Sequence, residues 1–138
     1  YLAVINNSLD SKIFQNFYAK VDGEKQDIMK GGELSCAFFV SSITTLFDFT
    51  KKVHGTVSST EKDLLESGWI KIEEPKIGSV IIWDEIDFDG EKHKHIGFYV
   101  GNDQAISNSC FEKVPKQHHW TFDDKRKVIS ILWNNKLD

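Results

Sequence analysis

The chain has 138 residues and a net charge of −4, and 40% of its residues are hydrophobic. These values are typical of one globular domain, so we expect a single domain over residues 1–138. The charge balance disfavours nucleic acid as a partner, and no apolar run approaches the roughly 18 residues that a membrane span needs.

Helical patterns occupy the first half of the chain. Residues 8–20 place four large apolar side chains on one helical face, with Ser8 as the N-cap and Gly23 as the stop. We expect residues 21–35 to form a loop.

A second helix is predicted to begin at Cys36. Apolar side chains follow this cysteine at helical spacing, which indicates an amphipathic helix over residues 36–47 with Ser35 as its N-cap. A third helix follows, because Ser58 and Glu61 have the spacing of a capping box and Gly68 provides a stop.

Beyond Pro75 the pattern changes to short segments rich in β-branched and aromatic residues. These segments are residues 78–83, 95–100, 104–109 and 127–133. Asn102 and Asp103 lie between the second and the third segment and have the chemistry of a two-residue hairpin turn. Helices that precede strands in this way predict an α+β fold with a mostly antiparallel sheet.

Cys36 is the first candidate for a catalytic residue, because it begins a predicted helix. The unpaired N–H groups and the dipole of a helix N-terminus stabilise a thiolate, and the same N–H groups can bind an oxyanion. Alternatively, Cys36 only packs in the core, as free cysteines often do. A disulfide to Cys110, the other cysteine, would also exclude a catalytic role.

A cysteine nucleophile needs a base, and His95 is the best placed of the five histidines because it opens the segment 95–100. The base in turn needs a polar residue on its second ring nitrogen. If the hairpin turn has two residues, Asn108 shares a sheet face with His95, and Cys110 lies opposite His95. A three-residue turn would place Ser107 there instead. We therefore take Asn108 as the third candidate and keep Ser107 as the alternative.

The order of these features resembles the NlpC-type and CHAP-type papain-like cysteine peptidases and amidases. The resemblance rests on the segments GGELSC, PKIGSVIIW and, above all, HIGFYVGNDQAISNS. It implies a papain-like fold, with Cys36 as the nucleophile and His95 as the base, and a gapless match implies Ser107 as the third residue. It also implies hydrolysis of peptide or amide bonds in bacterial peptidoglycan, without a cofactor or a metal.

The resemblance is incomplete around the cysteine. In the NlpC-type family an Asp usually precedes the cysteine and Ser-Gly follows it, whereas Ser35 and Ala37 flank Cys36 here. Since that Asp helps to hold the substrate's free amine in the family, γ-D-glutamyl endopeptidase specificity is not expected, and the segment looks closer to the CHAP type or to more distant amidase branches. Two alternatives stay open. One is a catalytically inactive binding module, and the other is an acyltransferase or deamidase on the same scaffold.

Two further motifs could bind metal, and both are disfavoured. The acidic segment 84–91 matches the first positions of an EF-hand loop, but the last ligand position holds Ile96, so we expect an acidic hairpin. His118 and His119 are adjacent, and adjacent side chains on a strand point to opposite faces, which disfavours a shared zinc site.

The compartment is not readable from the residues. The chain begins at Tyr1 and not at a methionine, so we expect a natural N-terminal segment, such as a signal peptide or an anchor, to be missing. The resemblance implies an extracellular or cell-envelope location.

Overall fold

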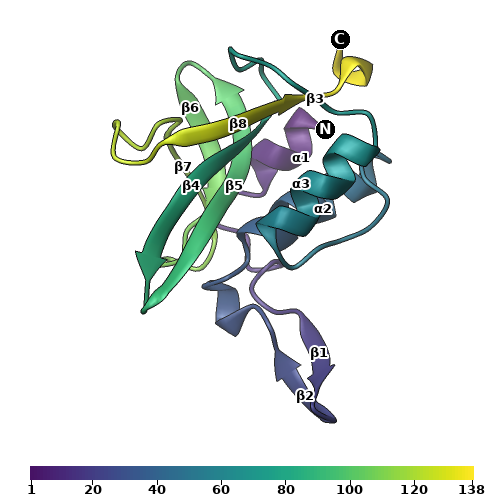
Figure 1. The fold of residues 1–138 in the computed structure, drawn as a ribbon, viewed down its shortest axis with the longest axis vertical. Coiled ribbons are helices and arrows are strands. Elements are labelled where there is room, and N and C mark those ends of the chain that lie inside the picture. Colours follow the sequence, from purple (N-terminus) through teal and green to yellow (C-terminus); the bar gives the residue numbers. More distant parts are fainter.

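The computed structural model describes all residues from 1 to 138, and it combines helices with antiparallel sheet (Figure 1). The helices are α1 (Leu2–Asn7), α2 (Cys36–Leu46) and α3 (Val57–Glu66). The strands are β1 (Tyr18–Val21), β2 (Glu24–Asp27), β3 (Ile70–Lys71), β4 (Val80–Phe88), β5 (Glu91–Gly101), β6 (Gln104–Asn108), β7 (Pro115–His119) and β8 (Val128–Trp133). Two 3-10 turns, η1 (Lys30–Gly32) and η2 (Asn135–Leu137), complete the chain.

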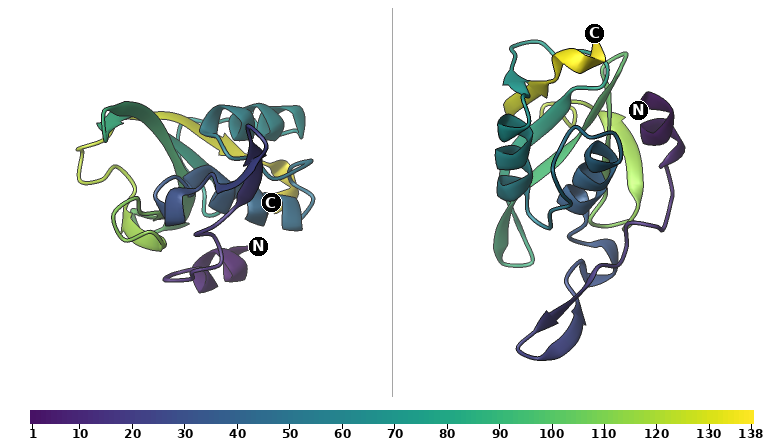
Figure 2. Two further views of the ribbon diagram at one scale, coloured as in Figure 1. Left: turned by 90° about the horizontal axis from the view of Figure 1, so that it is seen from below. Right: turned by 90° about the vertical axis from the view of Figure 1, so that its right-hand side faces the viewer.

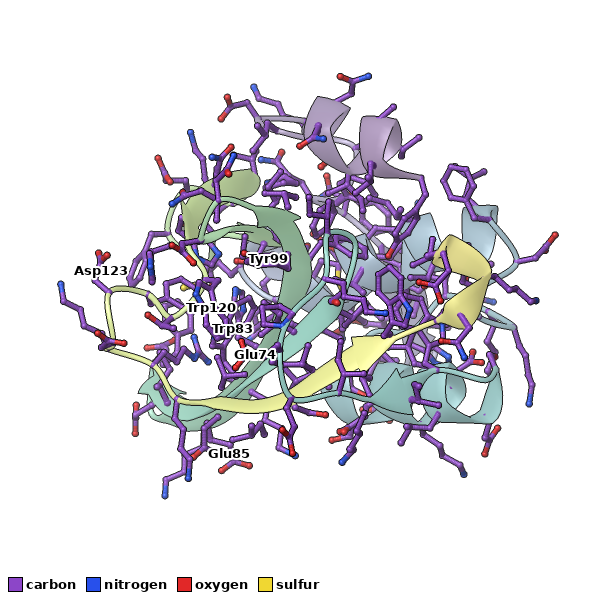
Figure 3. All side chains as sticks on the ribbon, turned by 90° about the horizontal axis from the view of Figure 1, so that it is seen from above. Glu74, Trp83, Glu85, Tyr99, Trp120 and Asp123 are labelled. Carbon is purple, nitrogen blue, oxygen red and sulfur yellow. The ribbon has the colours of Figure 1, made fainter.

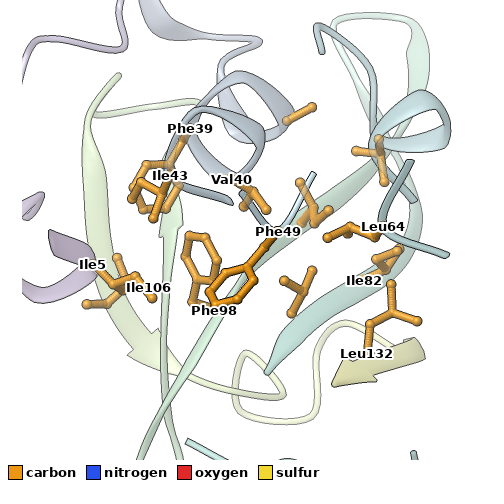
Figure 4. Packing of buried hydrophobic residues seen from close by; sticks show 14 of the residues in the cluster. Ile5, Phe39, Val40, Ile43, Phe49, Leu64, Ile82, Phe98, Ile106 and Leu132 are labelled. Carbon is orange, nitrogen blue, oxygen red and sulfur yellow. The ribbon is translucent and has the colours of Figure 1, made fainter. Parts of the chain in front are cut away.

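Six strands form the main sheet in the order β3-β8-β4-β5-β6-β7, and all neighbours are antiparallel. One face packs against α1, α2 and α3 over a core of 16 buried residues (Figure 4). Residues that alternate along β4 and β5, such as Ile82 and Phe98, supply this face because successive strand side chains point to opposite sides. None of the helices has the length and apolar character needed to cross a membrane.

The opposite face carries a smaller cluster of Ile81, Trp83 and Ala105. The loop between β7 and β8 covers it, and Figure 3 shows Trp83, Tyr99 and Trp120 gathered on this side. The Trp83 indole N–H donates to the Trp120 carbonyl at 2.8 Å, so the loop is fixed to the sheet. This face matters for the site, because the side chain of His95 belongs to it.

Two of the three predicted helices are confirmed. The helix predicted over residues 36–47 is α2, and Ser35 occupies its N-cap position, although the Ser35 side chain makes no capping hydrogen bond. The third helix is α3, but Thr56 caps it by accepting from the Ser59 N–H, so the predicted capping box is wrong. The chain leaves α3 at Gly68, whose φ of 93° favours glycine.

The helix predicted over residues 8–20 is wrong. The helical turns end at Asn7, and residues 18–27 form the two-stranded hairpin β1–β2, which projects from the body (Figures 1 and 2). Asp22 and Gly23 both have positive φ, at 51° and 84°, which fits a tight hairpin turn rather than a helix stop. The predicted loop over residues 21–35 therefore contains one strand of this hairpin and η1.

The strands after Pro75 are confirmed as β4, β5, β6 and β8, and the acidic segment 84–91 forms the expected β4–β5 hairpin. The turn of Asn102 and Asp103 also has two residues, since Gly101 pairs with Gln104. Strand β7 was not predicted, because PKQHH is polar and half-exposed and lacks the β-branched signal.

Candidate active site

A cleft of about 500 Å³ lies where the start of α2 meets β5. Its wall contains several side chains with reactive, charged or amide groups, among them Cys36, His93, His95, Asn108, Cys110 and Arg126. The loop that leads from α2 into α3 forms another part of the wall, through Gly55 and Thr56. The structure thus places three predicted site residues, Cys36, His95 and Asn108, on the wall of one cleft, with no hydrogen bond between Cys36 and His95.

Cys36 is the first residue of α2, as predicted. The β5–β6 ladder begins at the pair Gly97 and Ser107, so the part of β5 before Gly97 has no β6 partner. The backbone N–H of Ile96, in this unpaired part, acts as a hydrogen-bond donor to the Cys36 sulfur. The sulfur therefore lies next to the residue that follows His95.

The surroundings of Cys36 favour a neutral thiol in the free protein. Burial raises the pKa of Cys36 from 9.0 to about 11. Four groups act in the opposite direction without outweighing burial: the backbone N–H groups of Ile96, Ala37 and Cys36 itself, and the charge of Arg126. The helix N-terminus alone thus does not produce the thiolate that the sequence suggested.

His95 belongs to a chain of hydrogen bonds that crosses three strands. Its Nε2 lies 2.8 Å from Ser107 Oγ, and Ser107 Oγ lies 2.7 Å from His118 Nε2. His118 Nδ1 lies 2.8 Å from the backbone carbonyl of His119. Stacking of the His118 ring on Phe122, with ring centroids 3.9 Å apart, fixes the end of the chain.

The chain determines where the protons are. A carbonyl oxygen only accepts, so His118 Nδ1 carries the hydrogen and His118 Nε2 accepts from the Ser107 hydroxyl. Ser107 Oγ then accepts from the N–H of His95 Nε2, and His95 Nδ1 keeps a free lone pair. A neutral imidazole in this tautomer has one nitrogen held by the sheet and the other available as a base.

Both histidines of this chain are neutral near pH 7. Burial, followed by the charges of Arg126 and His118, holds the pKa of His95 well below its usual 6.5. Burial also lowers the pKa of His118, and this effect outweighs its bond to the His119 carbonyl. A neutral His118 is the form that accepts from Ser107, so the two pKa directions agree with the proton positions given above.

Gly97 allows His95 and Ser107 to come together. A Cβ atom at Gly97 would lie 2.7 Å from both the Ile106 carbonyl oxygen and the Ser107 Cβ. Such contacts are too short for ordinary packing, so β5 approaches β6 this closely only because residue 97 has no side chain.

The prediction that Asn108 contacts His95 is wrong, and Ser107, the alternative, makes that contact. The two-residue turn was predicted correctly, but an extra residue at Val100 shifts the register, so Gly97 pairs with Ser107. Cys110 consequently does not lie opposite His95. Asn108 instead donates from Nδ2 to the Gly32 carbonyl at 2.7 Å and so holds the loop that leads to Cys36.

The possible disulfide is absent, because Cys36 and Cys110 are both free. Cys110 follows the end of β6 and faces the same cleft. No group of three or more His, Cys, Asp or Glu side chains is placed to hold a metal ion. His118 instead belongs to the hydrogen-bond chain.

Sequence reasoning missed two residues, His118 and Arg126. His118 lies on β7, two strands from His95, and only the pairing of β6 with β7 brings it near Ser107. Arg126 lies in the loop before β8 and donates to the carbonyls of Asp84 and His93. The only signal for His118 was the alternation of polar residues in PKQHH. Arg126 is an isolated arginine in a charged loop, and nothing in the sequence marked it as a site residue.

Comparisons with known proteins give no family assignment: no protein-family model matches this chain, and no curated protein sequence matches it either.

Proposed function

We propose that this protein is a cysteine-dependent amide hydrolase with a papain-like fold of the NlpC or CHAP type. The observation that carries the proposal is a shared cleft: Cys36 at the start of α2 and His95 on β5 line it together, and Ser107 holds the far nitrogen of His95. Nucleophile, base and orienting residue are the three parts of a thiol hydrolase. By resemblance, the substrate is a peptide or amide bond of peptidoglycan.

The Cys36 thiol and the His95 imidazole are both neutral before the reaction, so the thiol proton moves to His95 during the attack. As the Cys36 sulfur attacks the amide carbon, His95 Nδ1 takes the thiol proton, and the carbonyl electrons move to oxygen. The backbone N–H groups at the start of α2, which have no side-chain cap, are donors for this oxyanion. No thiolate is needed before the substrate binds, which fits a thiol whose pKa is raised to about 11.

The reaction then proceeds through a thioester. The imidazolium of His95 gives its proton to the amine nitrogen, the C–N bond breaks, and the acyl group stays on sulfur. Water attacks the thioester while His95 accepts its proton, and the C–S bond breaks as the proton returns to sulfur. Ser107 accepts from His95 Nε2 throughout and keeps the ring oriented.

One observation favours a second candidate, an inactive module that binds cell-wall peptide. The raised pKa of Cys36 leaves a protonated thiol at neutral pH, and such a thiol is a weak nucleophile if His95 does not assist it. The two candidates differ in turnover: a binding module retains peptidoglycan fragments and releases no new amine from them.

The test is amine release from purified peptidoglycan and muropeptides. We expect release by the native chain, and a loss of at least about a hundredfold in Cys36→Ser and in His95→Gln, because each removes an essential part of the catalytic unit. His119→Gln is the matched histidine control and should retain activity, since the side chain of His119 bonds to Thr121 and not to the chain that holds His95.

The outcomes separate the candidates. Binding of muropeptides without amine release, equal in the native chain and in Cys36→Ser, would replace the hydrolase by the binding module. Amine incorporation at the expense of hydrolysis, in the presence of added amine, would indicate acyl transfer on the same scaffold.

A further inference from the structure

Arg126 is a fixed cation on the cleft wall that the proposed reaction does not use. Its Nε donates to the Asp84 carbonyl at 3.2 Å, and its Nη2 donates to the His93 carbonyl at 2.9 Å. Both carbonyls lie beside the bulge of the β4–β5 hairpin, where the register shifts between Trp83 and Ile86. A guanidinium has five N–H donors, so three remain for a ligand.

No carboxylate of the chain pairs with this guanidinium. Arg126 takes part in none of the ion pairs of the protein. The negative charge of Asp84 attracts the Arg126 guanidinium from a distance. The Asp84 carboxylate, however, accepts from the Glu85 N–H at 2.8 Å and does not bind Arg126. Because Arg126 is half-buried, its charge has lost part of its hydration without gaining an anionic partner.

The cleft wall also contains a buried acceptor without a donor. Asn108 is 1% exposed and lies on the cleft wall. Its Nδ2 must face the Gly32 carbonyl, because that oxygen only accepts, and its Oδ1 is left without a donor. Because this oxygen is closed off from solvent, a ligand in the cleft does not reach it, and Arg126 is the group left to bind an anion.

We propose that Arg126 binds a carboxylate of the substrate, so that the cleft selects peptide-like amides with a free carboxylate near the bond that Cys36 attacks. This inference rests on the proposed function for the identity of the reacting bond. The anion site itself depends only on Arg126. Arg126, Cys36 and His95 line the same cleft, so a carboxylate bound by Arg126 shares that cleft with the reacting atoms.

The test compares two alkylating reagents that differ only in charge. Iodoacetate carries a carboxylate and iodoacetamide is neutral, and the Cys110→Ser background leaves Cys36 as the single thiol. Any effect of Arg126 on thiol ionisation changes both rates equally, so the ratio of the iodoacetate rate to the iodoacetamide rate reports the anion site. We expect Arg126→Gln to lower this ratio by about tenfold, which is the effect of one charge-assisted hydrogen bond.

Lys127→Gln is the matched control, because it removes one positive charge from the neighbouring, exposed position. Its ratio should stay within about twofold of the background value, since surface charges are screened. An equal ratio in Arg126→Gln and in the background would overturn the proposal, as would an equal fall in Lys127→Gln. If Arg126→Gln does not fold, Arg126→Lys replaces it. A lysine cannot donate to the two carbonyls as arginine does, so its charge is displaced, and the ratio of the two alkylation rates should still fall.

A second measurement separates this inference from the proposed function. If Cys36 reacts with neither reagent, titration of Cys36→Ser with N-acetylglycine decides the anion site alone, while amine release from muropeptides decides the hydrolase proposal. We expect saturable amide shifts around residues 93–96 and 126 by NMR, lost in the double variant with Arg126→Gln. Shifts that persist in the double variant, or no shifts in Cys36→Ser, would overturn the anion site.

Discussion

Ser107 orients the ring of His95 with a single hydroxyl group. A hydroxyl both accepts and donates, so it can hold His95 only if another acceptor takes its own hydrogen. His118 provides that acceptor at 2.7 Å. The orientation of the proposed base therefore depends on a residue that does not touch it.

This dependence gives a prediction about tautomers. In the native chain we expect His95 to carry its proton on Nε2, with His118 protonated on Nδ1, as measured by long-range ¹⁵N–¹H NMR couplings. In His118→Phe the Ser107 hydroxyl loses its acceptor and can donate to His95 Nε2. His95 then moves its proton to Nδ1 and cannot accept from a thiol, so kcat should fall by roughly 10–100-fold.

Two results would contradict this arrangement. One is an Nδ1-protonated His95 in the native chain, and the other is an unchanged His95 tautomer in His118→Phe. The control is His119→Gln, which keeps the backbone carbonyl that binds His118 and should leave both tautomers as they are.

At the scale of elements, the close approach of β5 and β6 places His95 beside Ser107, and Gly97 makes this approach possible. Gly97→Ala would introduce a Cβ atom 2.7 Å from the backbone of Ile106 and from the side chain of Ser107. We expect a loss of about 1–3 kcal/mol in the free energy of unfolding, measured in denaturant, because neither neighbour is the end of a flexible side chain.

The matched control is Gly55→Ala. Gly55 does not have a positive φ, and a Cβ there meets only the side chains of Met29 and Ile28, at 3.6 and 3.8 Å. The free energy of unfolding should change by less than about 0.5 kcal/mol. Equal stability of both variants would show that β5 and β6 can separate without loss.

The elements also show which parts of the fold could be predicted from the sequence. α2 was predictable because its apolar spacing and its burial against β5 agree, and β4 was predictable because its β-branched run is buried. The β1–β2 hairpin was missed, since the apolar spacing of residues 13–18 matches a helix. The carboxylate of Asp27, which accepts from the Asn16 amide and the Phe17 N–H, favours the extended form instead.

The candidate site was predictable in part for a similar reason. Cys36 is marked by a local signal, the helix start. His95 does not open its strand as predicted, because β5 begins at Glu91. The partner of His95 depends on a bulge, and His118 depends on the pairing of β7, neither of which local residue types specify. Tertiary contacts of this kind must be observed.

For the whole molecule, the segment between α2 and α3 is held by a buried carboxylate. Asp63 accepts from His54 Nε2 at 2.7 Å, from the Lys51 N–H and from Ser67. Burial raises the pKa of Asp63, but these hydrogen bonds outweigh it and lower the pKa from 3.8 to about 2. The segment supplies the Gly55 and Thr56 part of the cleft wall, so this carboxylate connects stability with the site.

The lowered pKa predicts acid sensitivity with a definite sign. The stabilisation from ionised Asp63 is complete above the unfolded pKa near 4 and is lost as the pH falls toward about 2. Asp63→Asn should therefore lose about 2 kcal/mol at pH 7 and show a flatter fall in stability between roughly pH 4 and pH 2. Denaturant midpoints measured at several pH values give both quantities.

Asp48→Asn is the control for this prediction, because Asp48 is exposed and forms no ion pair. Asn also tolerates its positive φ of 56°. The stability of this variant should follow the pH profile of the native chain. An identical profile for Asp63→Asn would mean that the network around His54 does not depend on the charge.

The bulge in the β5–β6 hairpin also fixes which face each side chain of β6 takes. Gly101 adopts a φ of 92° next to the extra residue. Without that residue Asn108 would lie opposite Gly97 in place of Ser107, and Ile106 would leave the core for the other face, since a shift of one residue turns over every side chain of a strand. The partner of His95 and the packing of the core are therefore specified together, by a single irregularity in one hairpin.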